Sequence, residues 1–136
     1  MDVLASLRDK IMSTVRVLEL KNILPTGLKK HAIAVEIPKD ETFGDLSCNV
    51  AMVLSKQAKF NPRELASYFV KELSKDILIE TVDVAGPGFL NFKLTNNFWR
   101  KVVIAILNSG ISFGLDQVGK GKTINVEFVS ANPTGP

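Results

Sequence analysis

The chain has 136 residues, 46% of them hydrophobic, and its 17 Lys and Arg residues against 14 Asp and Glu residues give a net charge of +3. These values predict one globular domain with a short extension, and they allow a nucleic-acid partner without requiring one. They argue against a membrane-spanning or disulfide-stabilised protein, because no stretch approaches the roughly 20 apolar residues of a membrane helix and Cys48 is the only cysteine. A single thiol is typical of a reducing compartment such as the cytoplasm.

The first part of the chain predicts a helix and then a strand. Apolar side chains recur at helical spacing from Leu4 to Leu18, and Asp2 can cap that helix. Residues 33–37 alternate in the way a short strand does, which would place Ile33, Val35 and Ile37 on one face.

Two further helices are expected next. One begins at Asp45 or Ser47 and continues to Ala58. The other has the clearest start signal in the sequence, because Asn61 suits the N-cap and Pro62 the first helical turn. Its spacing predicts a buried stripe of Leu65, Ala66, Phe69, Val70 and Leu73.

A hairpin and a last helix follow. Residues 78–84 and 88–94 have strand composition, and the intervening Gly-Pro sequence predicts a tight turn rather than a ligand site. A helix capped by Thr95 or Asn96 is expected to continue to Ile106. Strands in a hairpin with helices grouped around them favour an α+β fold, in which a small antiparallel sheet is packed on one face by helices.

The second strand of this hairpin contains the candidate binding residues. Alternation would direct Leu90, Phe92 and Leu94 to the core, leaving Phe89, Asn91 and Lys93 as an exposed stripe. A phenyl ring can stack on an unpaired base, an amide can read a base edge, and a lysine can lie beside a phosphate. Residue types alone favour the simpler interpretation, in which Phe89 packs locally and the two polar residues are solvated.

Other motifs predict no chemistry. The glycine-rich segment 119–123 fails as a phosphate-binding loop, because the first glycine of that pattern would fall at Asp116 and the segment precedes a strand. His31 and Cys48 are each the only residue of their kind, so they assemble neither a metal site nor a nucleophile with its base. We expect His31 in a surface loop and Cys48 in the core.

The end of the chain is the most specific part of the sequence. Residues 123–129 have strand composition and lead into the loop Asn132-Pro133-Thr134-Gly135-Pro136, where the sequence stops. Ligands gather where strands of α/β proteins end in such loops. We interpret the chain as an N-terminal piece of a larger protein that stops just before its catalytic part.

These last residues, 126–136, resemble the start of the catalytic domain of arginyl-tRNA synthetases, which are class I enzymes. Four upstream segments resemble the N-terminal domain of the same family, and they occur in the same order: Glu36-Ile37-Pro38, residues 44–51 from Gly44-Asp45-Leu46-Ser47 to Asn49-Val50-Ala51, residues 61–66 and residues 85–92. The resemblance extends over about three-quarters of the chain. It implies three parts: an additional domain (1–110), a linker (111–122) and the truncated start of the catalytic domain (123–136).

The resemblance also implies site residues. Phe89 and Asn91 match positions that contact a base of the tRNA D-loop, with Lys93 as their neighbour. Glu127 and Asn132 match positions that bind the amino acid arginine. The region in which the family's ATP signature begins corresponds to Ala131, Asn132, Pro133, Thr134, Gly135 and Pro136.

The function implied by the resemblance is that of the parent enzyme. It would be a cytoplasmic, monomeric arginine–tRNA ligase that uses ATP with Mg²⁺ to activate L-arginine and attach it to tRNA(Arg). Residues 1–136 would contain no catalytic residue, bind no metal or cofactor and be inactive alone, because adenylate formation needs the missing parts held together. Two alternatives remain: a free-standing RNA-binding α+β module that ends at Pro136, and a structural interaction domain.

Overall fold

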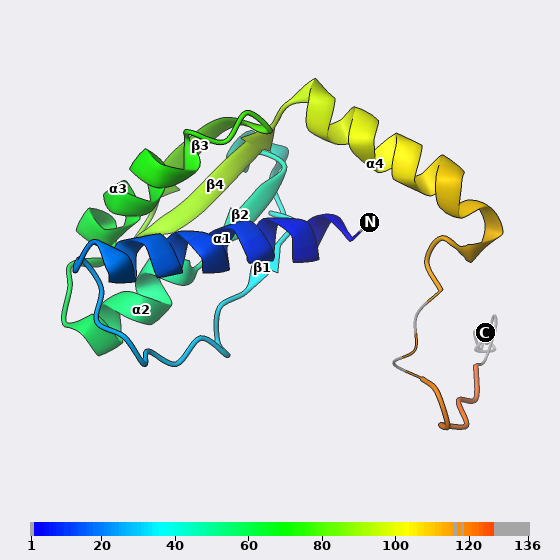
Figure 1. Ribbon diagram of the computed structural model, residues 1–136, viewed down its shortest axis with the longest axis horizontal. Helices are drawn as coiled ribbons and strands as arrows, with labels where there is room; N and C mark the ends of the chain where they lie inside the picture. The colour runs from blue at the N-terminus through cyan, green and yellow to red at the C-terminus, as the bar shows by residue number, and fades with distance from the viewer. Residues whose placement is uncertain (1, 116, 118, 127–136) are drawn as a thin grey trace, which may run out of the picture.

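The computed structural model describes residues 2–115, 117 and 119–126. Its four strands form one antiparallel sheet in the order β1-β2-β4-β3, so the predicted α+β class is confirmed (Figure 1). In chain order the elements are α1 (Val3–Leu20), β1 (Val35–Glu36), the 3-10 helix η1 (Glu41–Phe43), β2 (Leu46–Cys48), α2 (Val50–Ala58), α3 (Pro62–Leu73), β3 (Ile79–Ala85), β4 (Phe89–Leu94), α4 (Asn96–Ser109) and the 3-10 helix η2 (Gly110–Ser112).

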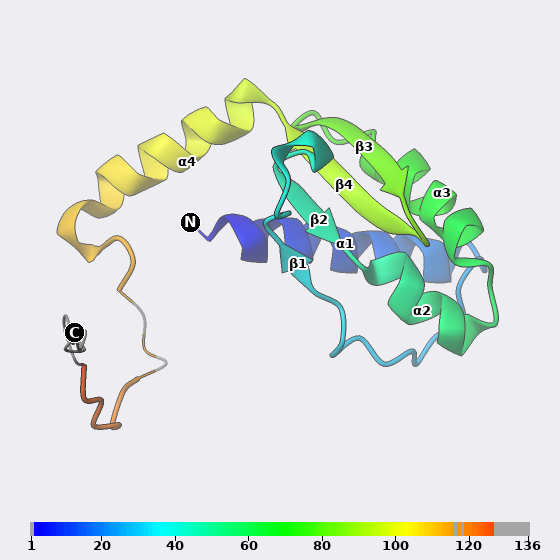
Figure 2. The same cartoon turned by 180° about the vertical axis from the view of Figure 1, so that it is seen from behind.

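Helices α1, α2 and α3 pack on one face of the sheet. The opposite face, seen in Figure 2, is covered by no α-helix in the described part of the chain, and we call it the open face. The core lies between the sheet and the three helices. Its largest fully buried side chains include Phe69, Phe92, Phe98, Ile11, Leu54 and Leu90.

The helix starts follow their capping residues. Asp2 Oδ1 accepts a hydrogen bond from the backbone N–H of Ala5 at 3.1 Å, and Asn61 Oδ1 accepts one from Arg63 at 3.0 Å. Thr95 Oγ1 accepts the corresponding bond from Phe98 at 3.3 Å. Each side chain satisfies a backbone donor that the first turn of a helix leaves without a partner, so the three predicted starts are confirmed.

The expected helix start at Asp45 or Ser47 is wrong. Residues 46–48 form β2, and α2 begins at Val50. Asp45 instead accepts a hydrogen bond at 2.7 Å from the backbone N–H of Leu94, at the far end of β4. β2 has only three residues, which is too short for its alternation of side chains to identify a strand in the sequence.

The first strand is shorter than predicted. Only Val35 and Glu36 pair with β2, and Ile37 is 74% exposed although Ile33 is buried. The chain turns away from the sheet at Pro38 and returns through η1 to β2, so Ile37 faces the space between this loop and the open face.

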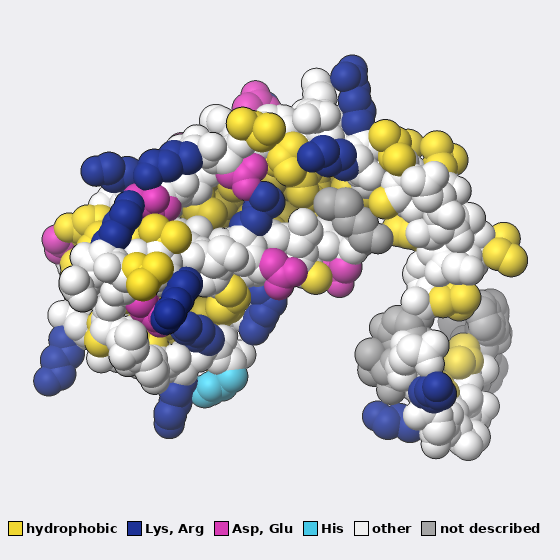
Figure 3. Space-filling model, viewed as in Figure 1, with side chains coloured by type: hydrophobic (Ala, Val, Ile, Leu, Met, Phe, Trp, Pro, Cys, Tyr) yellow, Lys and Arg dark blue, Asp and Glu magenta, His cyan; other side chains and the backbone are white. Residues whose placement is uncertain are grey.

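Helix α4 extends away from the sheet and its three covering helices (Figure 1). Only Phe98 and Val102 of this helix are buried, and apolar side chains gather along its surface in Figure 3. After η2, residues 113–115, 117 and 119–126 form neither helix nor strand. The predicted strand is therefore wrong over its described part, Thr123–Val126, which has no neighbouring strand to pair with, and its remainder lies outside the described residues.

None of the helices in the described residues is long and apolar enough to cross a bilayer.

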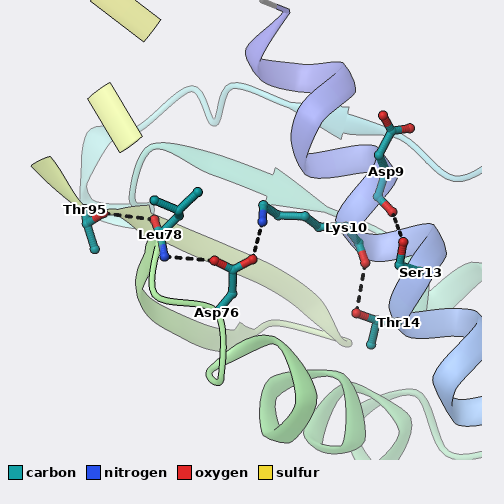
Figure 4. A network of polar contacts seen from close by, with 7 residues as sticks. All are labelled: Asp9, Lys10, Ser13, Thr14, Asp76, Leu78 and Thr95. Carbon is teal, nitrogen blue, oxygen red and sulfur yellow. Dashed lines mark hydrogen bonds and ion pairs between the residues drawn. The ribbon is translucent and has the colours of Figure 1, made fainter. Parts of the chain in front are cut away.

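A polar network ties α1 to the start of β3 and the end of β4 (Figure 4). Lys10 forms an ion pair with Asp76, whose other carboxylate oxygen accepts a hydrogen bond from the backbone N–H of Leu78 at 2.8 Å. The carbonyl of Leu78 accepts bonds from the backbone and hydroxyl of Thr95. Burial alone would raise the pKa of Asp76, but the Lys10 and Leu78 hydrogen bonds outweigh it and hold that pKa below its ordinary value of 3.8.

A lowered pKa in the folded state stabilises the protein above the ordinary carboxyl pKa, and this contribution is lost as the pH falls through the folded value. We expect Asp76→Asn to lower the free energy of unfolding by about 1 kcal/mol at pH 7. The difference from the unsubstituted chain should shrink as the pH falls below 3.8 towards 3, since the carboxyl of the unfolded chain has the higher pKa and takes up its proton first. Urea unfolding at both pH values measures it; a difference of equal size at both would contradict the assignment.

Candidate functional site

The centre of the open face is a row of four polar side chains, one from each strand. Glu36 of β1 pairs with Ser47 of β2, which pairs with Asn91 of β4, which pairs with Asp83 of β3. Residues directly opposite each other on antiparallel strands point to the same side of the sheet. Because the neighbouring pairs, Leu46 with Phe92 and Cys48 with Leu90, face the core, this polar row must face outward.

The two adjacent outward rows hold the other predicted residues. Phe89 pairs with Ala85 beside the hairpin turn, and Lys93 pairs with Thr81 further along the strands. The alternation predicted for β4 is thus confirmed: Leu90, Phe92 and Leu94 are buried in the core, while Phe89, Asn91 and Lys93 share the open face. The strand lies inside the sheet, between β2 and β3, and not at its edge.

A cleft of about 490 Å³ lies over one side of this face. Its floor and one wall include Ser47, Asn91 and Phe89, and the hairpin turn contributes Gly86 and Pro87. The opposite wall comes from Glu36 at the end of β1 and from the segment between β1 and β2, which contributes Ile37, Pro38, Lys39 and Phe43. The volume is within the range of about 300–1,000 Å³ typical of small-ligand sites. The cleft therefore has the size and the apolar walls to hold one flat ring system.

Asn91 departs from the exposed stripe expected from the sequence. It is only 9% exposed, while Phe89 is half-buried and Lys93 is exposed. Asn91 also lines a second hollow of about 250 Å³ on the other side of its strand. Phe43, which is distant in the sequence, lines both of these hollows with Asn91, and strand alternation cannot reveal such an arrangement.

Lys93 belongs to the second hollow and not to the cleft. Its ammonium lies 3.8 Å from a carboxylate oxygen of Glu80, and both side chains are more than half exposed. An exposed pair of this kind contributes little to stability and is weakened by salt, so the ammonium can exchange this partner for another anion. The structure thus brings Phe89 and Asn91 together and places Lys93 beside them.

The hairpin turn between β3 and β4 is held in place by contacts with α3. Arg63 of α3 donates a hydrogen bond to the carbonyl of Gly86. Gly88 has a φ of +131°, and a Cβ added there would lie 3.2 Å from Pro62, so the turn passes close to the start of α3. The prediction of a tight turn is confirmed, and its contacts with α3 fix the position of Phe89, the next residue.

Gly44 allows the opposite wall of the cleft, which contains Phe43, to lie close to β4. This residue has a φ of +88°, and an added Cβ would lie 2.6 Å from the carbonyl oxygen of Phe92. Only glycine fits so close to the backbone of β4 in this conformation. The adjacent Asp45 N–H donates to the same carbonyl at 2.8 Å. The loop carrying Phe43 is therefore fastened to the strand carrying Asn91.

Neither Cys48 nor His31 lines the cleft. Cys48 is buried on the core side, and that burial raises the pKa of its thiol to about 11, so it is not a nucleophile. His31 is an exposed residue, as predicted. The described residues contain no group of three or more His, Cys, Asp or Glu side chains that could hold a metal ion. The arrangement can bind and orient a ligand.

The other predicted site residues, Glu127, Asn132 and the segment 131–136, lie outside the described residues. Sequence reasoning also missed several residues of the cleft, among them Ile37, Phe43 and Ser47. The exposed apolar side chains of Ile37 and Phe43 leave no signal in the sequence that distinguishes them from core residues. Ser47 could not be placed because its strand was expected to be a helix.

Comparisons with known proteins agree on one family. The family model described as the arginyl tRNA synthetase N terminal domain matches residues 5–94. Arginine–tRNA ligases of Jannaschia sp. (strain CCS1) and Parvibaculum lavamentivorans are 46% and 45% identical to this chain over all 136 residues, which are 24% and 23% of those proteins. A third, from Brucella anthropi, is 45% identical over the same length. The chain spans about a quarter of the length of the curated relatives it matches.

Proposed function

The chain belongs to the family of arginyl-tRNA synthetase N-terminal domains, and on this basis we propose that it is the tRNA-docking domain of an arginine–tRNA ligase. The whole enzyme would activate L-arginine with ATP and Mg²⁺ and transfer it to the 3′ end of tRNA(Arg). The observation that supports docking by this domain is the cleft on the open face, where Phe89 and Asn91 line the same cavity.

In this proposal the cleft receives one unpaired base of the D-loop. The Phe89 ring stacks on the base, and the Asn91 amide forms hydrogen bonds with its edge. Lys93, in the adjacent hollow, lies beside a phosphate of the same segment. Ile37 and Phe43 close the site from the opposite wall and exclude water from the stacked base.

The charges around the cleft support recognition of a base over recognition of a phosphate. Glu36 and Lys39 both line the cleft, and Asp83 and Lys93 both line the adjacent hollow, so positive and negative groups nearly balance. A site without excess positive charge gains little from counterion release. Stacking and hydrogen bonding therefore supply most of the affinity in the cleft. Contacts with the RNA backbone are made by residues beside it, such as Lys93.

The arginine and ATP sites are proposed for the end of the chain, from the resemblance alone. Glu127 and Asn132 would contact arginine, and residues 131–136 would begin the ATP-binding region. We expect residues 1–136 to have no ligase activity by themselves, because binding and orienting three substrates requires the rest of the enzyme. We also propose that the whole enzyme is a monomer and that it works in the cytoplasm.

Nuclear magnetic resonance with the 136-residue chain tests the docking surface. On addition of a tRNA(Arg) transcript, we expect the signals of the Asn91 side-chain amide and of the backbone at Phe89 and Ser47 to shift in a saturable way. A transcript with its D-loop replaced should produce much smaller shifts. If the tRNA(Arg) shifts avoid β4 and the loop around Phe43, the cleft is not the docking site.

A further inference from the structure

The amide of Asn91 is held from one side by Ser47. The Ser47 hydroxyl donates a hydrogen bond to Asn91 Oδ1 at 2.9 Å. The two residues are opposite each other on β2 and β4, and they are only 8% and 9% exposed. The bond is thus of ordinary length, largely shielded from water and fixed by the register of the sheet.

Because a serine hydroxyl can donate or accept, Ser47 and Asp83 together determine which atoms Asn91 presents to a ligand. An asparagine side chain has a carbonyl oxygen on one side and an NH₂ group with two donors on the other. With Oδ1 turned towards β2, Nδ2 is directed away from it. Asp83, opposite Asn91 on β3, has only acceptor oxygens and favours the same orientation.

The Nδ2 group itself has no hydrogen-bond partner among the described residues, although Asn91 is nine-tenths buried. None of the described side chains contains a fully buried polar atom without a partner, so Nδ2 must reach an opening of the surface. Asn91 lines both the cleft and the adjacent hollow. A donor in such a position is available to a ligand acceptor.

We propose that Ser47 is a positioning residue that locks Asn91 in the orientation presenting Nδ2, so that the site selects a base edge with an acceptor atom, either a ring nitrogen or a carbonyl oxygen. This inference rests on the proposed function of the cleft. Without the Ser47 hydroxyl, Oδ1 loses its donor and only Asp83 still favours this orientation, so the amide is more free to rotate by half a turn and present its oxygen.

Kinetics of the full-length ligase with tRNA(Arg) test this assignment. We expect Ser47→Ala to raise KM for tRNA about fivefold, the factor associated with one ordinary hydrogen bond. Ser47→Thr keeps the hydroxyl and should restore most of the affinity. Ser67→Ala, which removes an exposed helix hydroxyl, is the matched control and should leave KM unchanged. Ser47→Cys keeps a side chain of similar volume without a strong hydrogen-bond donor. It replaces Ser47→Ala in the measurement if that variant does not fold.

A double-mutant cycle separates positioning from a general structural effect. If Ser47 acts through Asn91, then Ser47→Ala should have no further effect on KM in an Asn91→Ala background, whereas an independent structural role would multiply the two effects. Asn91→Asp keeps an acceptor for Ser47 but replaces Nδ2 with oxygen, so it should raise KM at least as much as Asn91→Ala.

The outcomes distinguish the two proposals. If Asn91→Ala leaves KM unchanged, the proposed function of the cleft is wrong. If Asn91→Ala raises KM while Ser47→Ala does not, or does so equally in both backgrounds, the cleft stands and the positioning role of Ser47 is overturned.

Discussion

Phe92→Ala is expected to lower the free energy of unfolding by about 3–5 kcal/mol, the usual cost of removing a buried phenyl ring. Phe92 is 0% exposed and lies in the middle of β4, on the face covered by α2 and α3. Its ring fills the space between the sheet and these helices, and a cavity would remain. Since small domains have only about 5–15 kcal/mol of stability in total, this variant should be close to unfolding at 37 °C.

Phe89→Ala on the same strand is the matched control. Phe89 has the same side chain but points to the open face, where it is half-buried, so its loss should cost about 1 kcal/mol or less. Urea unfolding of the 136-residue chain, followed by circular dichroism, measures both. Equal losses for the two variants would mean that the faces of β4 are assigned wrongly, and the site with them.

The elements that the sequence predicted well are those determined by local chemistry. Asn61 and Pro62 identify the start of α3 because capping needs only the first turn of a helix. The faces of β4 follow from alternation within a single strand. Both signals lie within a few residues of the feature they specify.

The elements that could not be predicted from the sequence depend on long-range contacts. β2 is a strand of three residues, held between β1 and β4. Asp45 and Ser47, which are residue types that cap helices, made this segment look like the start of a helix. The parts of the candidate site that the sequence did not predict also depend on long-range contacts. Phe89 and Asn91 could be predicted from their strand, whereas the burial of Asn91 and the wall formed by Phe43 depend on how residues 37–45 fold back onto the sheet.

Recognition of tRNA by the full-length ligase should depend strongly on the two residues of the cleft. We expect Phe89→Ala and Asn91→Ala each to cost about 1–3 kcal/mol, because one removes a stacking surface and the other a base-edge contact. This corresponds to a rise in KM for tRNA(Arg) of about 5- to 150-fold. Activation of arginine does not pass through this cleft in the proposal, so KM for arginine should change little.

Two exposed residues outside the cleft provide matched controls. Phe113→Ala removes an exposed phenyl ring near the end of the described chain, and Asn97→Ala removes an exposed amide in the first turn of α4. Neither residue lines the cleft, so both variants should retain the native KM for tRNA.

The most direct test of the docking cleft is therefore KM for tRNA(Arg), measured for these four variants of the full-length enzyme. The cleft predicts a rise for Phe89→Ala and Asn91→Ala and none for Phe113→Ala and Asn97→Ala. Native KM values for both cleft variants, with the fold intact, would contradict it.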